Sequence, residues 1–98
     1  MTSETTPILL VHGGAGTVGD ELHAAAVAGV RAAAALGQRA LLAGQSAVDA
    51  AIAAVRALED DPTFNAGRGA CLNDDGFIEV DAGIMRSTDR RSGAVAGV

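Results

Sequence analysis

The spacing of apolar residues changes along the chain, and each spacing predicts its own kind of element. Residues 8–11 form an unbroken apolar run after Pro7, which predicts a short strand buried on both faces. From residue 20 to about residue 42, Leu22, Ala26 and Val30 begin an apolar stripe at helical spacing, which predicts a long amphipathic helix. Gly44 is the kind of residue at which such a helix ends.

A second helix is predicted directly after that stop. Ser46 is followed three residues later by Asp49, a pairing typical of a capping box, in which the side chain of the first residue accepts a hydrogen bond from a free amide of the first turn. The apolar residues at positions 48, 52 and 55 share one helical face, and Pro62 ends the pattern.

Beyond residue 69 the spacing is that of strands. Residues 70–72 and 77–82 flank Asn-Asp-Asp-Gly at 73–76, whose composition is typical of a hairpin turn, and residues 93–98 predict a further strand. The order is strand, two helices, β-hairpin, strand. This order matches neither alternating βαβ units nor an all-β sandwich, and it predicts an α+β fold with both helices on one face of a sheet.

Composition limits the size of the core. The chain has 98 residues, of which 49% are hydrophobic and 19% charged, so it can fold but forms one domain at most. Only two residues, Phe64 and Phe77, are aromatic, and a core built from small aliphatic side chains buries little area. We therefore expect residues 1–98 to form a single incomplete domain whose apolar faces need further protein to cover them.

The charge and the chain ends exclude several classes of partner. The net charge is −5, no basic patch is present, and no apolar run approaches the roughly 20 residues of a membrane span, so neither nucleic acid nor membrane is expected as a partner. The first six residues are polar and lack the basic region of a signal peptide, which favours a cytoplasmic location. Cys71 is the single cysteine, so no internal disulfide can form; we expect it to be buried on a strand.

Gly14, Gly16 and Gly19 match the G-x-G-x-x-G spacing of dinucleotide-binding loops, because they follow a predicted strand and precede a predicted helix. A dinucleotide-binding unit needs a second strand ending in an acidic residue about 20 residues further on. Here one helix is followed by another, so a dinucleotide-binding βα unit is kept only as a lesser alternative.

The acidic turn and the two histidines offer little catalytic chemistry. An EF-hand register around residues 73–76 would place Cys71 and Ala82 at the first and twelfth positions, where calcium needs oxygen side chains. A nucleophilic Cys71 would need a positioned base, and His12 and His23 are the only histidines. These two histidines have no recognisable metal-ligand spacing with the acidic residues.

Four segments in order carry a family resemblance. They are Ile-Leu-Leu-Val-His-Gly-Gly-Ala-Gly at 8–16, Asp-Pro-Thr-Phe-Asn-Ala-Gly-Arg-Gly-Ala at 61–70, Glu-Val-Asp-Ala at 79–82 and Gly-Ala-Val-Ala-Gly-Val at 93–98. Together they resemble the plant-type L-asparaginases, or isoaspartyl peptidases, which are N-terminal-nucleophile (Ntn) hydrolases. One departure is that the family usually has Asp-Gly after the methionine at position 85, where this chain has Arg86-Ser87.

The resemblance implies both a fold and an activity. The fold is an αββα Ntn-hydrolase sandwich, of which this chain would be the N-terminal portion of the α-subunit region. The activity is hydrolysis of L-asparagine and β-aspartyl dipeptides by a threonine nucleophile, freed by autoproteolysis, whose own α-amine serves as the base. That threonine lies beyond residue 98, so the chain would hold no catalytic residue and would be inactive alone. Its implied partner is the rest of the precursor, the threonine-bearing β-subunit, in a dimer of αβ units.

Thr17 also lies in a Gly-Thr-Val-Gly stretch like the one around the family's nucleophile. A helix is predicted directly after it, where the family has a strand, and an internal threonine has no free α-amine. We interpret Thr17 as a loop residue before a helix.

The resemblance also implies the site residues of this chain. His12, Gly13 and Gly14 would form a loop beside the catalytic threonine, with Asn65 adjacent to it. The family holds a structural sodium ion through main-chain oxygens and uses no organic cofactor. Carried over by position, the ion's ligands are the carbonyl groups of Leu58, Glu59, Asp61, Phe64, Ala66 and Arg68. The carboxylates of Glu59, Asp60 and Asp61 leave a calcium site, or a merely solvated helix end, as alternatives.

Two functions remain open from the sequence. The first is the front part of an asparaginase, catalytic only together with its threonine-bearing remainder. The second is a non-catalytic truncated product or an interaction module, which would keep the scaffold without the chemistry.

Overall fold

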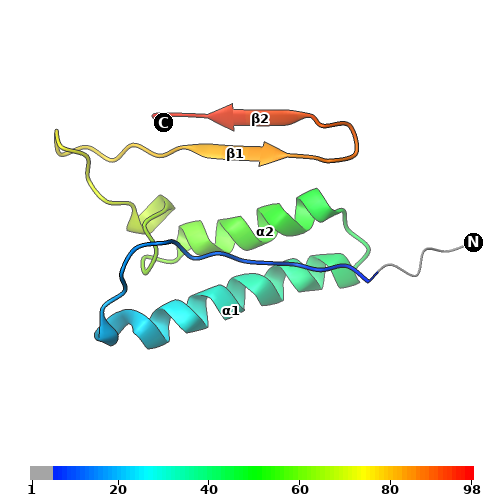
Figure 1. Ribbon diagram of the computed structural model, residues 1–98, viewed down its shortest axis with the longest axis horizontal. Helices are drawn as coiled ribbons and strands as arrows, with labels where there is room; N and C mark the ends of the chain where they lie inside the picture. Colours follow the sequence, from blue (N-terminus) through cyan, green and yellow to red (C-terminus); the bar gives the residue numbers. More distant parts are fainter. Residues whose placement is uncertain (1–5) are drawn as a thin grey trace, which may run out of the picture.

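Two antiparallel helices dominate the computed structural model, which describes residues 6–98. Helix α1 (Asp20–Leu42) and helix α2 (Ala47–Asp60) lie side by side, and a short 3₁₀ turn, η1 (Gly67–Gly69), follows α2. Strands β1 (Ala82–Met85) and β2 (Ser92–Val95) form an antiparallel hairpin beyond α2 (Figure 1). The predicted α+β class is confirmed. No helix within the described residues is long and apolar enough to cross a membrane.

Local hydrogen bonds mark the start of α2 and the end of α1. Ser46 caps α2, because its Oγ accepts a hydrogen bond from the Asp49 amide at 3.1 Å. Helix α1 ends at Leu42, and Gly44, which follows its C-cap Ala43, has a φ of +83° that favours glycine. There the Gly44 amide donates to the Leu41 carbonyl and the Gln45 amide to the Ala40 carbonyl, so two otherwise unpaired carbonyl groups of the last turn are satisfied.

The helices pack through small residues. The buried positions of this interface are Ala33, Gly37 and Ala40 on α1 and Ala50 and Ala54 on α2. A Cβ atom built on Gly37 would lie 2.5 Å from Leu9 Cδ2 and 3.1 Å from the Ala50 carbonyl oxygen. Any larger residue would therefore displace Leu9 and crowd the α2 backbone at this crossing, where α1, α2 and the chain around Leu9 meet.

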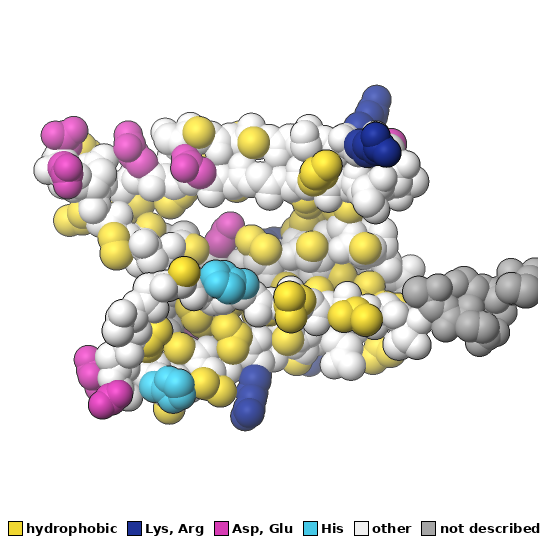
Figure 2. Space-filling model, in the orientation of Figure 1, with side chains coloured by type: hydrophobic (Ala, Val, Ile, Leu, Met, Phe, Trp, Pro, Cys, Tyr) yellow, Lys and Arg dark blue, Asp and Glu magenta, His cyan; other side chains and the backbone are white. Residues whose placement is uncertain are grey.

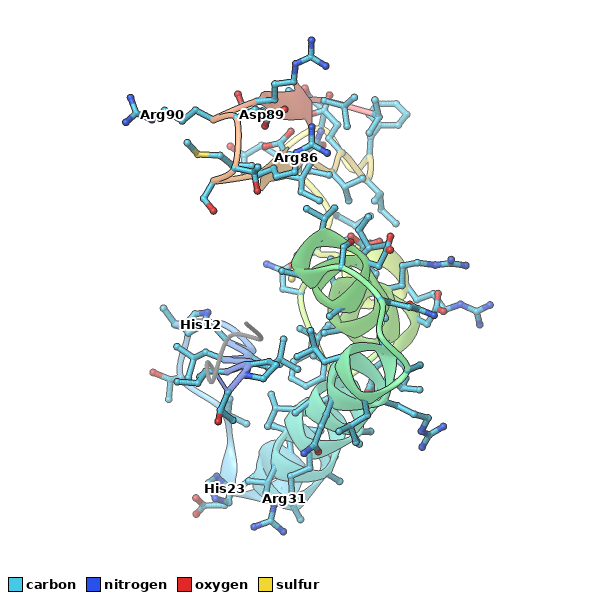
Figure 3. The ribbon with its side chains drawn as sticks, turned by 90° about the vertical axis from the view of Figure 1, so that its right-hand side faces the viewer. His12, His23, Arg31, Arg86, Asp89 and Arg90 are labelled. Carbon is cyan, nitrogen blue, oxygen red and sulfur yellow. The ribbon has the colours of Figure 1, made fainter. Side chains whose placement is uncertain are left out.

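The predicted strand over residues 8–11 is wrong for this structure. The segment runs along one side of the helix pair and pairs with no strand of the described chain (Figures 1 and 3). Leu9 and Val11 are half-buried, while Ile8 and Leu10 are 90% and 92% exposed. The apolar run therefore has one covered face and one open face, because the helices cover only one side and no second sheet layer covers the other.

The predicted hairpin over residues 70–82 is also misplaced. Its turn does form, because Asn73 Oδ1 accepts hydrogen bonds from the amides of Asp75 and Phe77. The preceding residues do not pair as a strand, since the Cys71 amide donates instead to Asn65 Oδ1 at 2.8 Å. Cys71 is exposed and lies outside the strands, so the expectation of a buried strand cysteine is wrong.

The hairpin that forms lies further along the chain, between β1 and β2. The paired residues are Ala82 with Val95, Gly83 with Ala94, Ile84 with Gly93 and Met85 with Ser92. Asp89 holds its turn, because the carboxylate accepts hydrogen bonds from the Arg86 guanidinium and the Arg91 amide.

Pairing resumes after a bulge in the predicted 93–98 strand. Val80 and Val98 exchange two backbone hydrogen bonds of 3.1 Å, although the register of β1 and β2 leaves one extra residue on the second arm. Gly97, with a φ of +64°, accommodates this extra residue in the bulge, and its amide donates to Asp81 Oδ1 at 2.9 Å. Every residue of β1 and β2 is exposed, so the hairpin has no packed face within the described chain.

The close contact at Gly37 leads to a stability prediction. The substitution Gly37→Val should lower the free energy of unfolding by about 1–3 kcal/mol, because the added side chain forces α1, α2 and Leu9 apart. Ala35→Val, at an exposed position of the same helix, is the control and should cost only about 0.5 kcal/mol of helix propensity. Urea unfolding measures both. Equal losses in the two variants would contradict the close packing at Gly37.

Candidate functional site

A groove of about 740 Å³ lies where the turn before α1, the first half of α1 and the loop after α2 meet. Figure 2 shows histidine side chains, in cyan, on one face of the molecule, and Figure 3 labels His12 and His23 on different segments. The groove brings together all four residues expected beside the active site, namely His12, Gly13, Gly14 and Asn65. His23 and Thr17 line it as well.

His12 is oriented by its own turn. The amide N–H of Gly14 donates to His12 Nδ1 at 3.3 Å, in a turn where Gly14 has a φ of +120°. A ring nitrogen that accepts a hydrogen bond carries no proton, so the neutral ring carries its proton on Nε2. Nε2 is therefore the ring nitrogen that can donate a hydrogen bond.

Phe64 forms the base of the groove and is its one buried residue. It is 7% exposed, and it is the only buried residue larger than alanine among residues 6–98. A Cβ atom built on Gly13 would lie 3.0 Å from the Phe64 ring, and one built on Gly29 of α1 would lie 2.6 Å from it. The ring therefore packs between the His12–Gly14 turn and α1, and both neighbours must be glycine for it to fit.

Asn65 follows Phe64 at the rim of the groove. Its side-chain oxygen accepts the Cys71 amide, a contact across six residues that closes the loop over residues 65–71. The same side chain therefore lines the groove and fixes the loop behind it.

Asp61 caps the end of α2 and starts the loop. Its carboxylate accepts a hydrogen bond of 2.9 Å from the Thr63 amide. This bond, followed by a second one from the Thr63 hydroxyl, lowers the pKa of Asp61 below its ordinary value, because both donors stabilise the charged form. The other carboxylate oxygen faces α1, where a Cβ on Gly29 would lie 2.7 Å from it.

The expected carbonyl ligands follow one another through this loop. Leu58, Asp61, Phe64 and Ala66 each accept a backbone hydrogen bond from an amide two or three residues later, so the chain from 58 to 69 winds tightly. A carbonyl group has two lone pairs, so one such bond leaves capacity for a cation.

Two glycines show where these oxygens gather. A Cβ built on Gly67 would collide with the carbonyl oxygen of Glu59, and one on Gly69 with those of Phe64 and Pro62. Carbonyl oxygens thus crowd around η1, and oxygen ligands of this kind suit a hard cation. The carbonyl group of Pro62 belongs to this cluster but was not among the expected ligands. Its position depends on the turn after α2, which the sequence pattern does not specify.

The structure does not bring the other candidate residues together in a site. Within residues 6–98 no three His, Cys, Asp or Glu side chains lie close enough to hold a metal ion. Gly14, Gly16 and Gly19 precede α1, but the segment before them pairs with no strand in the described chain, so the structure lends no support to a dinucleotide site. Thr17 lies in the turn before α1, as its loop interpretation predicts.

Comparison with known proteins gives one family. The family model described as asparaginase matches residues 5–98. The plant-type L-asparaginase of Thermococcus kodakarensis is 50% identical over 91 residues, covering 92% of this chain and 29% of that protein. The isoaspartyl peptidase/L-asparaginase of Macaca fascicularis is 50% identical over 93 residues, covering 94% of this chain and 30% of that protein. The chain thus spans about 30% of the length of the curated relatives it matches.

The hydrogen bonds to Asp61 predict a pH dependence. Because its pKa is lower in the folded chain than in the unfolded one, these bonds contribute stability above about pH 4 that is lost as the pH falls through the folded value. Thr63→Val removes the hydroxyl donor but keeps the amide, so the pKa of Asp61 should rise part of the way towards its ordinary value. Carboxyl NMR titration measures it, with Thr88→Val in the exposed hairpin turn as control. An unchanged Asp61 titration in Thr63→Val would contradict this assignment.

Proposed function

The chain belongs to the asparaginase family, and from that premise we propose that it is the N-terminal part of an amidohydrolase that acts on L-asparagine and β-aspartyl dipeptides. The observation that carries this proposal is the meeting of His12, Gly13, Gly14 and Asn65 on one groove. These residues come from two of the segments that resemble the family, and Asn65 lies 51 positions after Gly14 in the sequence.

This chain supplies a wall of the proposed active site. Gly13 and Gly14 expose backbone at the rim without side chains, so a reacting group can approach closely. His12 offers its Nε2 proton to the substrate or to a group that positions it.

The nucleophile comes from elsewhere in the enzyme. Thr17 and Thr63 line the groove, but both lie inside the chain, so neither has the free α-amine that activates an N-terminal threonine. The proposed nucleophile is a threonine freed by autoproteolysis outside these 98 residues. The chain alone is accordingly inactive.

The loop over residues 58–68 is the proposed sodium site. The carbonyl groups of Leu58, Glu59, Asp61, Phe64, Ala66 and Arg68 would hold the ion, and the crowding of carbonyl oxygens around Gly67 and Gly69 supports this. When bound, the ion supplies positive charge at the centre of the turn and no catalytic chemistry. The chain's own part is to keep the oxygens gathered through its backbone hydrogen bonds.

The hairpin is the proposed site of assembly. Ile52 and Val55 of α2 and Ile84 and Val95 of the hairpin line an apolar groove of about 390 Å³, and each is more than a third exposed. These surfaces support a single incomplete domain that becomes an αββα sandwich when the threonine-bearing part covers the sheet. The dimer of αβ units and the cytoplasmic location remain predictions.

A chimera tests the proposed function. Residues 1–98 would replace the matching segment of the Thermococcus kodakarensis relative, and ammonia release from L-asparagine would be measured. We expect an active chimera that is unaffected by Thr17→Ala, and no ammonia release from the 98-residue chain alone. A folded but inactive chimera would favour the non-catalytic module. Steady release by the chain alone, abolished by Thr17→Ala, would make Thr17 the nucleophile and contradict the proposal.

A further inference from the structure

We propose that Phe64 couples the carbonyl loop, residues 58–68, to the His12–Gly14 turn, so that cation binding in the loop fixes the shape of the groove wall. Phe64 is in this sense a positioning residue, which acts on the groove through Gly13. The inference rests on the proposed cation site, and it adds a route by which that site acts on the groove.

The backbone of Phe64 is part of the loop. Its amide donates to the Asp61 carbonyl at 3.3 Å, and its carbonyl accepts the Ala66 amide at 2.8 Å. The same carbonyl oxygen faces Gly69, within the cluster of oxygens around η1. A cation that draws these oxygens inward therefore moves the Phe64 backbone directly.

The side chain of Phe64 leaves the loop and ends in the groove. Its ring lies between Gly13 on one side and Gly29 on the other. On the α1 side the ring lies against Gly29, where even a Cβ would be only 2.6 Å from it. Since closely packed groups pass displacements on rather than absorb them, a shift of the Phe64 backbone reaches Gly13.

Gly13 has equally little freedom. A Cβ built on it would lie 2.8 Å from Val30 Cγ1 and 3.0 Å from the Phe64 ring, so the turn is in close contact with both. Gly16, in the same turn, has nothing within 4 Å of such an atom. The Phe64 ring therefore acts on the turn at Gly13. A displacement of Gly13 also moves the Gly14 amide, which donates to His12 Nδ1 and so orients the His12 ring.

Energetic coupling between two sites is reciprocal. A change that disturbs the turn at Gly13 should therefore weaken cation binding in the loop, at most by the factor by which the cation favours the native turn. For couplings of this kind a change of about 5-fold or more in affinity is expected.

An NMR titration with NaCl, balanced by choline chloride at constant chloride, tests the coupling. Amide signals of Ala66 and Gly67 report on the loop, and that of Gly14 reports on the turn. In the unsubstituted chain both sets should shift with one midpoint. Gly13→Ala should raise the loop midpoint about 5-fold, while Gly16→Ala, the matched control, should leave it unchanged. In Phe64→Leu the loop should still titrate, but the Gly14 signal should no longer follow it.

Three results would overturn the proposal. Equal midpoints in Gly13→Ala and Gly16→Ala would mean that the turn does not sense the loop. A Gly14 signal that follows the loop in Phe64→Leu would mean that the ring does not carry the coupling. In the unsubstituted chain, loop signals that shift with sodium while the Gly14 signal stays fixed would contradict the coupling but not the cation site. Loop signals that do not shift with sodium would contradict both the cation site and the coupling.

Discussion

The packing of one aromatic ring between two glycines holds the groove together. Phe64 lies against Gly13 and Gly29, so it joins the first turn of the chain, α1 and the loop after α2. The other buried residues of the described chain are alanines and one glycine, and each of these buries little apolar area. The ring thus supplies the largest single apolar contact at the point where the site residues meet. Without it, the His12–Gly14 turn would keep only Val30 and the chain around Leu9 to hold it on α1.

The packing of α1 against α2 supports the contact between Phe64 and its two glycines. Small residues let α1 and α2 approach closely, and Gly37 marks the point of closest approach. Ser46 caps the start of α2 and Gly44 follows the end of α1, whereas Asp61 caps the end of α2, where the loop begins. The hairpin stands apart from this arrangement. It is held by the Asp89 turn and the bulge at Gly97, and its faces remain open.

The helices could be predicted from the sequence because their signals are local. Apolar spacing, the pairing of Ser46 with Asp49 and the stop at Gly44 all act within a few residues. The hairpin is misplaced in the sequence prediction because a residue outside the predicted segment takes one of its amides: the Cys71 amide donates to Asn65, and the turn at Asn73 has no strand before it. The groove was expected through resemblance alone. From the sequence, Gly13 suggests a flexible loop and Gly29 a weak position in a helix. Neither pattern indicates that the two glycines make room for the Phe64 ring.

The central claim is that Phe64 holds the three segments together, and amide hydrogen exchange in Phe64→Leu and Phe77→Leu tests it most directly. Phe77 is the other phenylalanine and is 68% exposed, so its replacement changes composition equally without removing a packed ring. Phe64→Leu should lower the free energy of unfolding by about 1–3 kcal/mol and speed exchange both in the loop around Ala66 and at the His12–Gly14 turn. Phe77→Leu should leave both segments unchanged. Equal exchange in the two variants, or faster exchange in the loop with an unaltered turn, would contradict the account.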